Sequence, residues 1–140
     1  MIARATPVLP GEAQGPVLRL REPISFWGGI DPRTGTVTDP GSTACGRVVT
    51  GTVLVIAATR GSSSASAVLL ELLHAGRAPA ALVLGAVDAI LGLGVLVAAE
   101  MGWPTIPLAV LSAASQEELA EGTLVRLTSD GRIEHATQAT

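Results

Sequence analysis

The apolar residues of this chain form short runs separated by polar and glycine-containing segments. Three runs have the length of buried strands and are bounded by turn residues; they cover residues 48–58, 80–84 and 105–110. Between them, apolar residues recur at helical spacing and predict helices over residues 67–75 and 88–101. Because these predicted strands and helices alternate, we expect a parallel strand–helix–strand centre with right-handed crossovers.

Shorter patterns flank this centre. A strand is predicted over residues 16–20, and a terminal hairpin over residues 123–127 and 132–134, joined at Ser129-Asp130-Gly131. A helical turn is expected over residues 117–121. The whole pattern predicts an α/β fold with β-rich outer parts around a parallel centre.

The chain has the size of one domain. Its 140 residues are enough for a hydrophobic core, and 48% of them are apolar. With one Phe, two Trp and no Tyr, that core must be aliphatic. Residues 1–15 are rich in Pro, Gly and small side chains and are expected to form a loose arm, with a single domain over residues 16–136.

Charge and cysteine content exclude several functions. A net charge of −3 without a basic block gives little support for nucleic-acid binding. Cys45, the single cysteine, cannot form an intramolecular disulfide, nor hold an iron–sulfur cluster or structural zinc alone, and His74 and His135 lack metal-ligand spacing. Any metal is therefore expected on a partner.

The mean hydropathy of +0.49 raises the question of a membrane. The uncharged stretch between Asp88 and Glu100 is shorter than the roughly 20 residues that a spanning helix needs. The N-terminal residues also leave no room for the apolar part of a signal peptide. We therefore expect a cytoplasmic protein.

Residues 61–110 carry very little charge. Such a segment is hard to solvate on a small monomer and predicts an apolar contact surface for a partner subunit. Its formal charges are Glu71, Arg77, Asp88 and Glu100.

A polar turn rich in hydroxyl groups, the serine turn, lies between the predicted strand at 48–58 and the helix at 67–75. It reads Arg60-Gly61-Ser62-Ser63-Ser64-Ala65-Ser66. One serine suffices to cap a helix, which contributes about 1 kcal/mol. N–H groups at a helix N-terminus also bind anions and stabilise an ionised hydroxyl, and a glycine lets a ligand approach closely. The turn is therefore either a helix cap or a site that presents a nucleophile or base.

Conventional serine hydrolysis finds no support. No Ser–His–Asp arrangement can be argued, because His74 falls within the predicted helix and His135 near the end of the sequence. The G-x-S-x-G elbow is also absent. Asp31 and Asp39, in the loops before the strand at 48–58, are expected to bond locally within turns.

Several motifs taken together resemble the small subunit of the aconitase X family, over roughly residues 15–112. They are Ser25-Phe26-Trp27-Gly28-Gly29-Ile30-Asp31-Pro32 with Thr34-Gly35, Arg60-Gly61-Ser62-Ser63-Ser64, Leu69-Leu70-Glu71, Ala78-Pro79-Ala80-Ala81, Ile90-Leu91-Gly92-Leu93-Gly94 and Ile106-Pro107. The resemblance implies an aconitase-like swivelling β/β/α domain that closes over a large catalytic subunit as a heterodimer. It also implies an iron or iron–sulfur centre on that large subunit.

The resemblance further implies a hydro-lyase, active only with its large subunit. In the family's motif the first serine after the glycine accepts a proton from the carbon next to a carboxylate, a role that maps to Ser62. Ser63 and Ser64 would orient the substrate carboxylate, Gly61 would let it approach, and Arg60 would stabilise the alkoxide or the anionic substrate.

Two substrates occur in the family, cis-3-hydroxy-L-proline in bacteria and mevalonate 5-phosphate in archaea. The Ala- and Arg-rich composition and the Phe26-Trp27 pair favour the bacterial kind. One departure is the missing His-Pro pair after Asp39, which puts specificity or activity in doubt. Residues Gly94 to Pro104 also resemble a phosphohistidine domain, but the histidine of such a domain is absent here. A non-catalytic binding or regulatory module stays open as an alternative.

Overall fold

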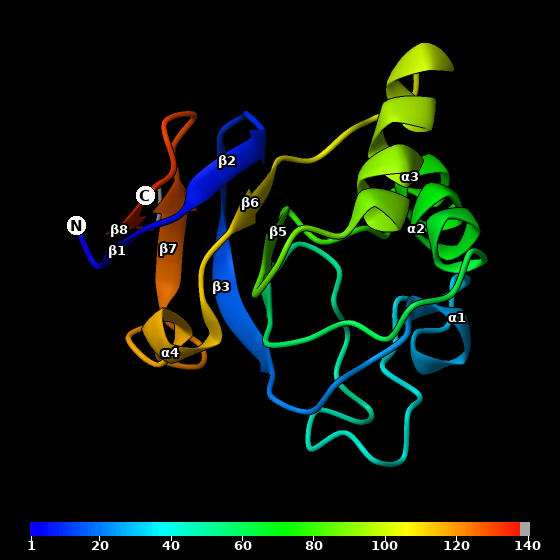
Figure 1. Ribbon diagram of the computed structural model, residues 1–140, viewed down its shortest axis with the longest axis horizontal. Coiled ribbons are helices and arrows are strands. Elements are labelled where there is room, and N and C mark those ends of the chain that lie inside the picture. The colour runs from blue at the N-terminus through cyan, green and yellow to red at the C-terminus, as the bar shows by residue number, and fades with distance from the viewer. Residues whose placement is uncertain (138–140) are drawn as a thin grey trace.

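Eight strands and four helices are present in the computed structural model, which describes residues 1–137 (Figure 1). The strands are β1 (Ala3–Arg4), β2 (Thr6–Leu9), β3 (Ala13–Leu20), β4 (Val53–Ile56), β5 (Ala81–Leu84), β6 (Leu108–Val110), β7 (Leu124–Leu127) and β8 (Arg132–His135). The helices are α1 (Phe26–Gly29), α2 (Ala65–Ala75), α3 (Ala89–Glu100) and α4 (Ala113–Gln116).

The strands form one mixed sheet in the order β1-β8-β7-β3-β4-β5-β6-β2. The pairs from β3 through β4 and β5 to β6 are parallel, and all others are antiparallel. This confirms an α/β fold with a parallel βαβ centre and flanking antiparallel strands. Because β1 and β2 follow each other in the chain but pair at opposite ends of the sheet, they bring its two edges together into a near-barrel.

The expectation of a loose arm over residues 1–15 is wrong. These residues form β1, β2 and the start of β3, and Ala5 between the first two strands is buried. Outer strands expose rows of unpaired N–H and C=O groups, and the N-terminal segment satisfies them at both ends of the sheet. Pro7 and Pro10 are compatible with this role, since proline is tolerated at a sheet edge.

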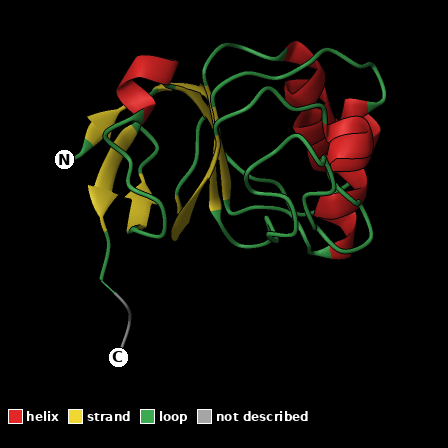
Figure 2. Cartoon of the chain, turned by 90° about the horizontal axis from the view of Figure 1, so that it is seen from below, coloured by secondary structure: helices red, strands yellow, loops and turns green. Residues whose placement is uncertain are grey.

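The central strands have no exposed face. All residues of β4 and β5 are buried, as their uninterrupted apolar runs predict. Alternate residues face two cores: Leu54 and Leu82 belong to the core under α2 and α3, and Val53 and Val83 to the core on the other face. Helices α2 and α3 therefore cover one side of the sheet, while β1, β7 and β8 lie on the other (Figure 2).

Element boundaries differ from the predictions where turn chemistry decides them. Strand β4 is shorter than the apolar run over 48–58, because Gly51 adopts a φ of 72° and the Thr52 N–H donates to the carbonyl of Val49. The helical turn expected over 117–121 lies earlier, as α4, because the Ser112 hydroxyl accepts a hydrogen bond from the Ser115 N–H.

Helix α3 carries the apolar surface expected from the scarcity of charge. Leu93 and Leu96 are 54% and 52% exposed, and Val87 and Met101 at the two ends of the helix are also exposed. Helix α2 is amphipathic by comparison and ends at Gly76, which has a φ of 72°. Within residues 1–137, no helix has both the length and the apolar character needed to cross a membrane.

Candidate functional site

The serine turn lies at the edge of the sheet where the parallel strands end. Strand β4 leads into it, and the adjacent β5 leads into the start of α3, so the two connections lie next to each other. Gly85 allows this close approach, because a Cβ atom at that position would overlap the carbonyl oxygen of Ala57. The Thr59 hydroxyl also donates to Asp88 Oδ2 at 2.7 Å. In open parallel sheets, this edge is where ligands bind.

Ser64, the residue before α2, makes no capping bond with its side chain, although Ser62 does bond to a backbone N–H in this turn. The N-cap residue, Ser64, has helical backbone angles (φ −77°, ψ −10°) and makes no side-chain capping bond. Ser62 Oγ instead accepts a hydrogen bond from the Ser64 N–H at 3.3 Å, and Ser66 Oγ donates to the carbonyl of Ser63 at 3.1 Å. Capping therefore accounts for the Ser62 hydroxyl and leaves the hydroxyls of Ser63 and Ser64 unexplained.

Several polar groups of the turn remain available to a ligand. Among residues 1–137, the hydroxyls of Ser63 and Ser64 have no hydrogen-bond partner, and the N–H groups of Ser63 and Ser66 donate to no acceptor. Free N–H groups at the start of a helix attract anions, because the helix dipole adds to their own positive ends. The turn can thus receive a carboxylate.

Arg60 and Gly61, the two residues before the serines, were expected to stabilise charge and to let a ligand approach. Arg60 is exposed, and its backbone N–H donates to the carbonyl of Ile24 at 2.8 Å. Gly61 has no positive φ, and no atom lies within 4 Å of the position a Cβ would take. Gly61 therefore has a backbone conformation that other residues can also adopt, and its missing side chain leaves open space beside the serines.

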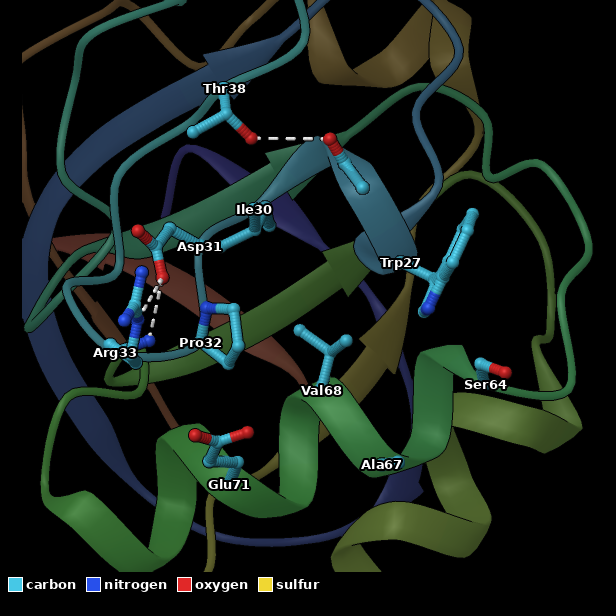
Figure 3. A pocket seen from close by; sticks show the side chains of 11 residues that line it. Trp27, Ile30, Asp31, Pro32, Arg33, Thr38, Ser64, Ala67, Val68 and Glu71 are labelled. Atoms are coloured by element: carbon cyan, nitrogen blue, oxygen red, sulfur yellow. Dashed lines mark hydrogen bonds and ion pairs between the residues drawn. The ribbon is translucent and has the colours of Figure 1, made fainter.

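A cleft of about 660 Å³ separates α2 from the glycine-rich loop, residues 25–35 (Figure 3). Of the predicted site residues only Ser64 lines it, whereas Ser62, Ser63, Gly61 and Arg60 lie outside its lining. The complete lining is Trp27, Gly28, Ile30, Asp31, Pro32, Arg33, Thr38, Ser64, Ala67, Val68 and Glu71.

Sequence reasoning missed this cleft, although it identified both of its sides. The glycine-rich loop and α2 are far apart in the chain, and no pattern predicted that they pack together. Spacing did hold one signal: Ser64, Val68 and Glu71 are four and three residues apart and so share one helix face. Figure 3 shows Val68 and Glu71 pointing from α2 toward the loop.

The aspartates of the two loops bond locally, as predicted. Asp31 Oδ1 accepts a hydrogen bond from the Arg33 N–H at 2.9 Å, and Asp39 Oδ1 accepts one from the Gly41 N–H at 2.8 Å. The Arg33 guanidinium also lies 3.8 Å from Asp31. These contacts shape the loops and partly neutralise one side of the cleft.

Glu22 fixes the second loop, where the His-Pro pair is missing. Its carboxylate accepts hydrogen bonds from the Thr43 N–H at 2.7 Å and the Thr43 hydroxyl at 3.1 Å. The backbone hydrogen bond from Thr43 is the main cause that lowers the pKa of Glu22 below its ordinary value. Thr43 therefore anchors this loop by a contact that sequence reasoning did not anticipate.

The described residues do not build a metal site. Within residues 1–137, no three His, Cys, Asp or Glu side chains come together in a way that could hold a metal ion. Cys45 is exposed, and His74 packs against Trp103 with ring centroids 4.2 Å apart. The side chains present do not fit an iron or iron–sulfur centre.

Comparison with known proteins agrees with this geometry. Residues 2–135 match the family model of the aconitase X swivel domain. The crystal structure of Thermococcus kodakaraensis aconitase X in its holo-form superposes with a TM-score of 0.83 at 30% identity, covering 96% of this chain and 97% of that one.

Two kinds of dehydratase appear among the relatives. Cis-3-hydroxy-L-proline dehydratase of Pseudomonas aeruginosa is 43% identical over 91% of this chain, which spans only 22% of that relative's length. The phosphomevalonate dehydratase small subunit of Methanopyrus kandleri is 37% identical, with 94% of this chain and 95% of that one covered. Because the family model covers nearly the whole of this sequence and the fold is shared, the chain belongs to the aconitase X swivel-domain family.

Proposed function

We propose that this chain is the small subunit of a dehydratase that removes water from cis-3-hydroxy-L-proline, with Ser62 as the base. One observation carries the proposal: Ser62 Oγ accepts a hydrogen bond from a backbone N–H at the N-terminus of α2. Such a bond and the positive end of the helix dipole both stabilise a serine alkoxide, the form that can remove a proton from carbon. The similarity to the Pseudomonas aeruginosa dehydratase supports the choice of substrate.

The remaining groups of the turn are suited to hold the substrate. In this proposal, the free N–H groups of Ser63 and Ser66 and the hydroxyls of Ser63 and Ser64 bind the substrate carboxylate. The Arg60 side chain adds positive charge from the solvent side. Ser62 then takes the proton from the carbon that bears this carboxylate, the C–H electron pair forms a double bond to the neighbouring carbon, and hydroxide leaves that carbon.

The rest of the active site is assigned to a large subunit. The described residues offer no ligand cluster for the iron or iron–sulfur centre that the family resemblance implies, so we place that centre on the partner. The chain spans about a fifth of the length of the hydroxyproline dehydratases that it matches. The exposed apolar residues of α3 supply surface for a subunit contact.

Phosphomevalonate is the second candidate substrate. The observation in its favour is similarity, because the phosphomevalonate dehydratase small subunit of Methanopyrus kandleri is 37% identical over 94% of this chain. The two kinds of relative have similar identity to this chain, so the substrate must be decided by assay.

The test is reconstitution with the large subunit and assay of both substrates. We expect dehydration of cis-3-hydroxy-L-proline, and a loss of about 10²–10⁴-fold in kcat for Ser62→Ala, the range that a positioned base contributes. Ser129→Ala, an exposed serine in the terminal hairpin, is the matched control and should keep full activity.

Other outcomes identify which part of the proposal fails. Near-normal turnover by Ser62→Ala in an intact complex would remove Ser62 as the base. If the complex dehydrated phosphomevalonate and not cis-3-hydroxy-L-proline, phosphomevalonate would be the substrate. A chain that forms no complex and supports no dehydration would be a separate binding module.

A further inference from the structure

The cleft between α2 and the glycine-rich loop contains one charge that no neighbour balances. Its charged lining residues are Asp31, Arg33 and Glu71. Arg33 lies beside Asp31, at 3.8 Å, and so offsets its charge. Among residues 1–137, Glu71 has no cationic group within 4.0 Å and no hydrogen bond to its carboxylate. The lining therefore has one negative charge in excess, that of Glu71, an exposed residue, and a second anion placed beside it would be disfavoured.

Glu71 lies at the far end of the cleft from the serine turn. Ser64 and Glu71 are seven residues apart on α2, which corresponds to two turns and about 10 Å along the helix axis. Side chains tilt toward the N-terminus of a helix, so the carboxylate leans back toward Ser64. In Figure 3, Val68 lies between the two. A molecule held at the serine turn and extending along α2 would pass Val68 and bring its far end to Glu71.

The other walls of the cleft are largely apolar. Trp27 is 63% exposed and faces the cleft near Ser64, and Ile30, Pro32 and Val68 complete the apolar lining (Figure 3). These side chains can pack against a small saturated ring, and the indole N–H of Trp27 is the one hydrogen-bond donor that they offer to a phosphate. Arg33 is the one basic side chain in the lining, and Asp31 already lies beside it.

We propose that Glu71 is a specificity residue that excludes substrates with a second anionic group remote from the reacting carbon. This inference rests on the proposed function, because it assumes that the reacting carbon is held at the serine turn. Cis-3-hydroxy-L-proline is compact and carries its carboxylate and its ammonium group on one carbon, so nothing anionic reaches Glu71. The phosphate of phosphomevalonate is several bonds from the reacting carbon and would meet the Glu71 carboxylate. Repulsion of this kind is a common way to discriminate between ligands.

The experiment uses the complex with the large subunit and measures phosphomevalonate as an inhibitor of hydroxyproline dehydration. Glu71→Gln keeps the size of the side chain and removes its charge. We expect its inhibition constant for phosphomevalonate to fall about tenfold, the size of effect that one nearby charge produces in a partly enclosed site. The KM for hydroxyproline should change less than about threefold, because that substrate carries no charge near Glu71. Glu71→Lys should lower the inhibition constant further.

Glu100→Gln is the matched control. It removes the same charge from the exposed end of α3, outside the cleft, and should leave the inhibition constant unchanged. Equal inhibition of the parent complex and Glu71→Gln would overturn the inference. So would an equal change in Glu100→Gln, since the effect would then reflect net charge alone.

A binding measurement separates this inference from the proposed function. If the complex dehydrates no hydroxyproline, the proposed function fails, but calorimetry of phosphomevalonate binding to the same complex still tests Glu71. Tighter binding by Glu71→Gln than by the parent complex would support the role of Glu71 even then. Unchanged or weaker binding would refute it.

Discussion

The N-termini of α2 and α3 follow neighbouring parallel strands, yet they are built in opposite ways. At α3, Asp88 has extended backbone angles, and its Oδ1 accepts hydrogen bonds from the N–H groups of Ile90 and Leu91 at 3.0 and 3.1 Å. Its second oxygen accepts from Thr59. At α2, four serines are available; Ser62 Oγ accepts one backbone N–H, and the hydroxyls of Ser63 and Ser64 accept none. The N–H groups of Ala65 and Ala67 donate to backbone carbonyls of the turn, while those of Ser63 and Ser66 stay free among the described residues.

At this edge of the sheet, the start of α3 therefore contributes to stability, and the start of α2 offers groups that can react or bind. A carboxylate at the start of α3 stabilises that helix and also holds the serine turn in place through Thr59. Both oxygens of Asp88 are occupied by hydrogen bonds from the protein, whereas the hydroxyls of Ser63 and Ser64 and the N–H groups of Ser63 and Ser66 are free to bind a substrate. Variants at the two termini should therefore differ sharply in their effects on folding and activity.

The largest effect on stability is expected where the two connections touch. In Gly85→Ala the new methyl group would overlap the Ala57 carbonyl, so the connection after β4 must move. We expect a loss of about 1–3 kcal/mol in the free energy of unfolding. Urea titration measures it. Gly92→Ala is the control within α3, where a Cβ meets no atom within 4 Å, and it should stabilise the protein by up to about 1 kcal/mol.

Removal of the aspartate cap should have the next largest effect. Asp88→Ala deletes the acceptor for both N–H groups at the start of α3, and we expect a loss of about 1–2 kcal/mol by chemical denaturation. Asp88→Asn keeps an oxygen acceptor and should recover most of this loss. If Asp88→Asn were as unstable as Asp88→Ala, the cap would not be the source of the effect.

At the start of α2, substitution of Ser64 should hardly change the stability. Ser64→Ala removes a hydroxyl that makes no capping bond, so the free energy of unfolding should shift by less than about 0.5 kcal/mol. Thermal unfolding monitored by circular dichroism can check this directly. A loss as large as that of Asp88→Ala would mean that Ser64 caps α2 in solution, and the contrast between the two termini would disappear.

A pH-dependent effect is expected at Glu22, whose carboxylate has the same kinds of donor as Asp88, a backbone N–H and a threonine hydroxyl. Its pKa is lower in the folded protein than the ordinary value of 4.5, so the ionised carboxylate favours folding. This contribution is fully present above the ordinary pKa and is lost as the pH falls through the lower, folded pKa. Melting temperatures between about pH 7 and pH 3 should therefore fall more steeply for the parent protein than for Glu22→Gln. Parallel curves would contradict this.

Local patterns predicted the centre of the fold because that part depends on local chemistry. Buried parallel strands require uninterrupted apolar runs, and residues 80–84 form such a run directly after Pro79. The N-terminal strands were missed because residues 1–15 have no strong pattern of their own, and their pairing partners lie in β6 and β8, far along the chain. The site divides in the same way, since the serine turn is a local motif while the cleft beside it arises from long-range packing.

The closing of the sheet by β1 and β2 has a consequence for the order of folding. Ala3 pairs with Ile133, so the first strand to be synthesised finds its partner only when the last strand has been made. Contacts of such large sequence separation form slowly, because a long loop must first be closed. The parallel centre can assemble before this step, whereas the two edges meet late. We therefore expect the joint between β1 and β8 to be among the last structures to form and among the first to open.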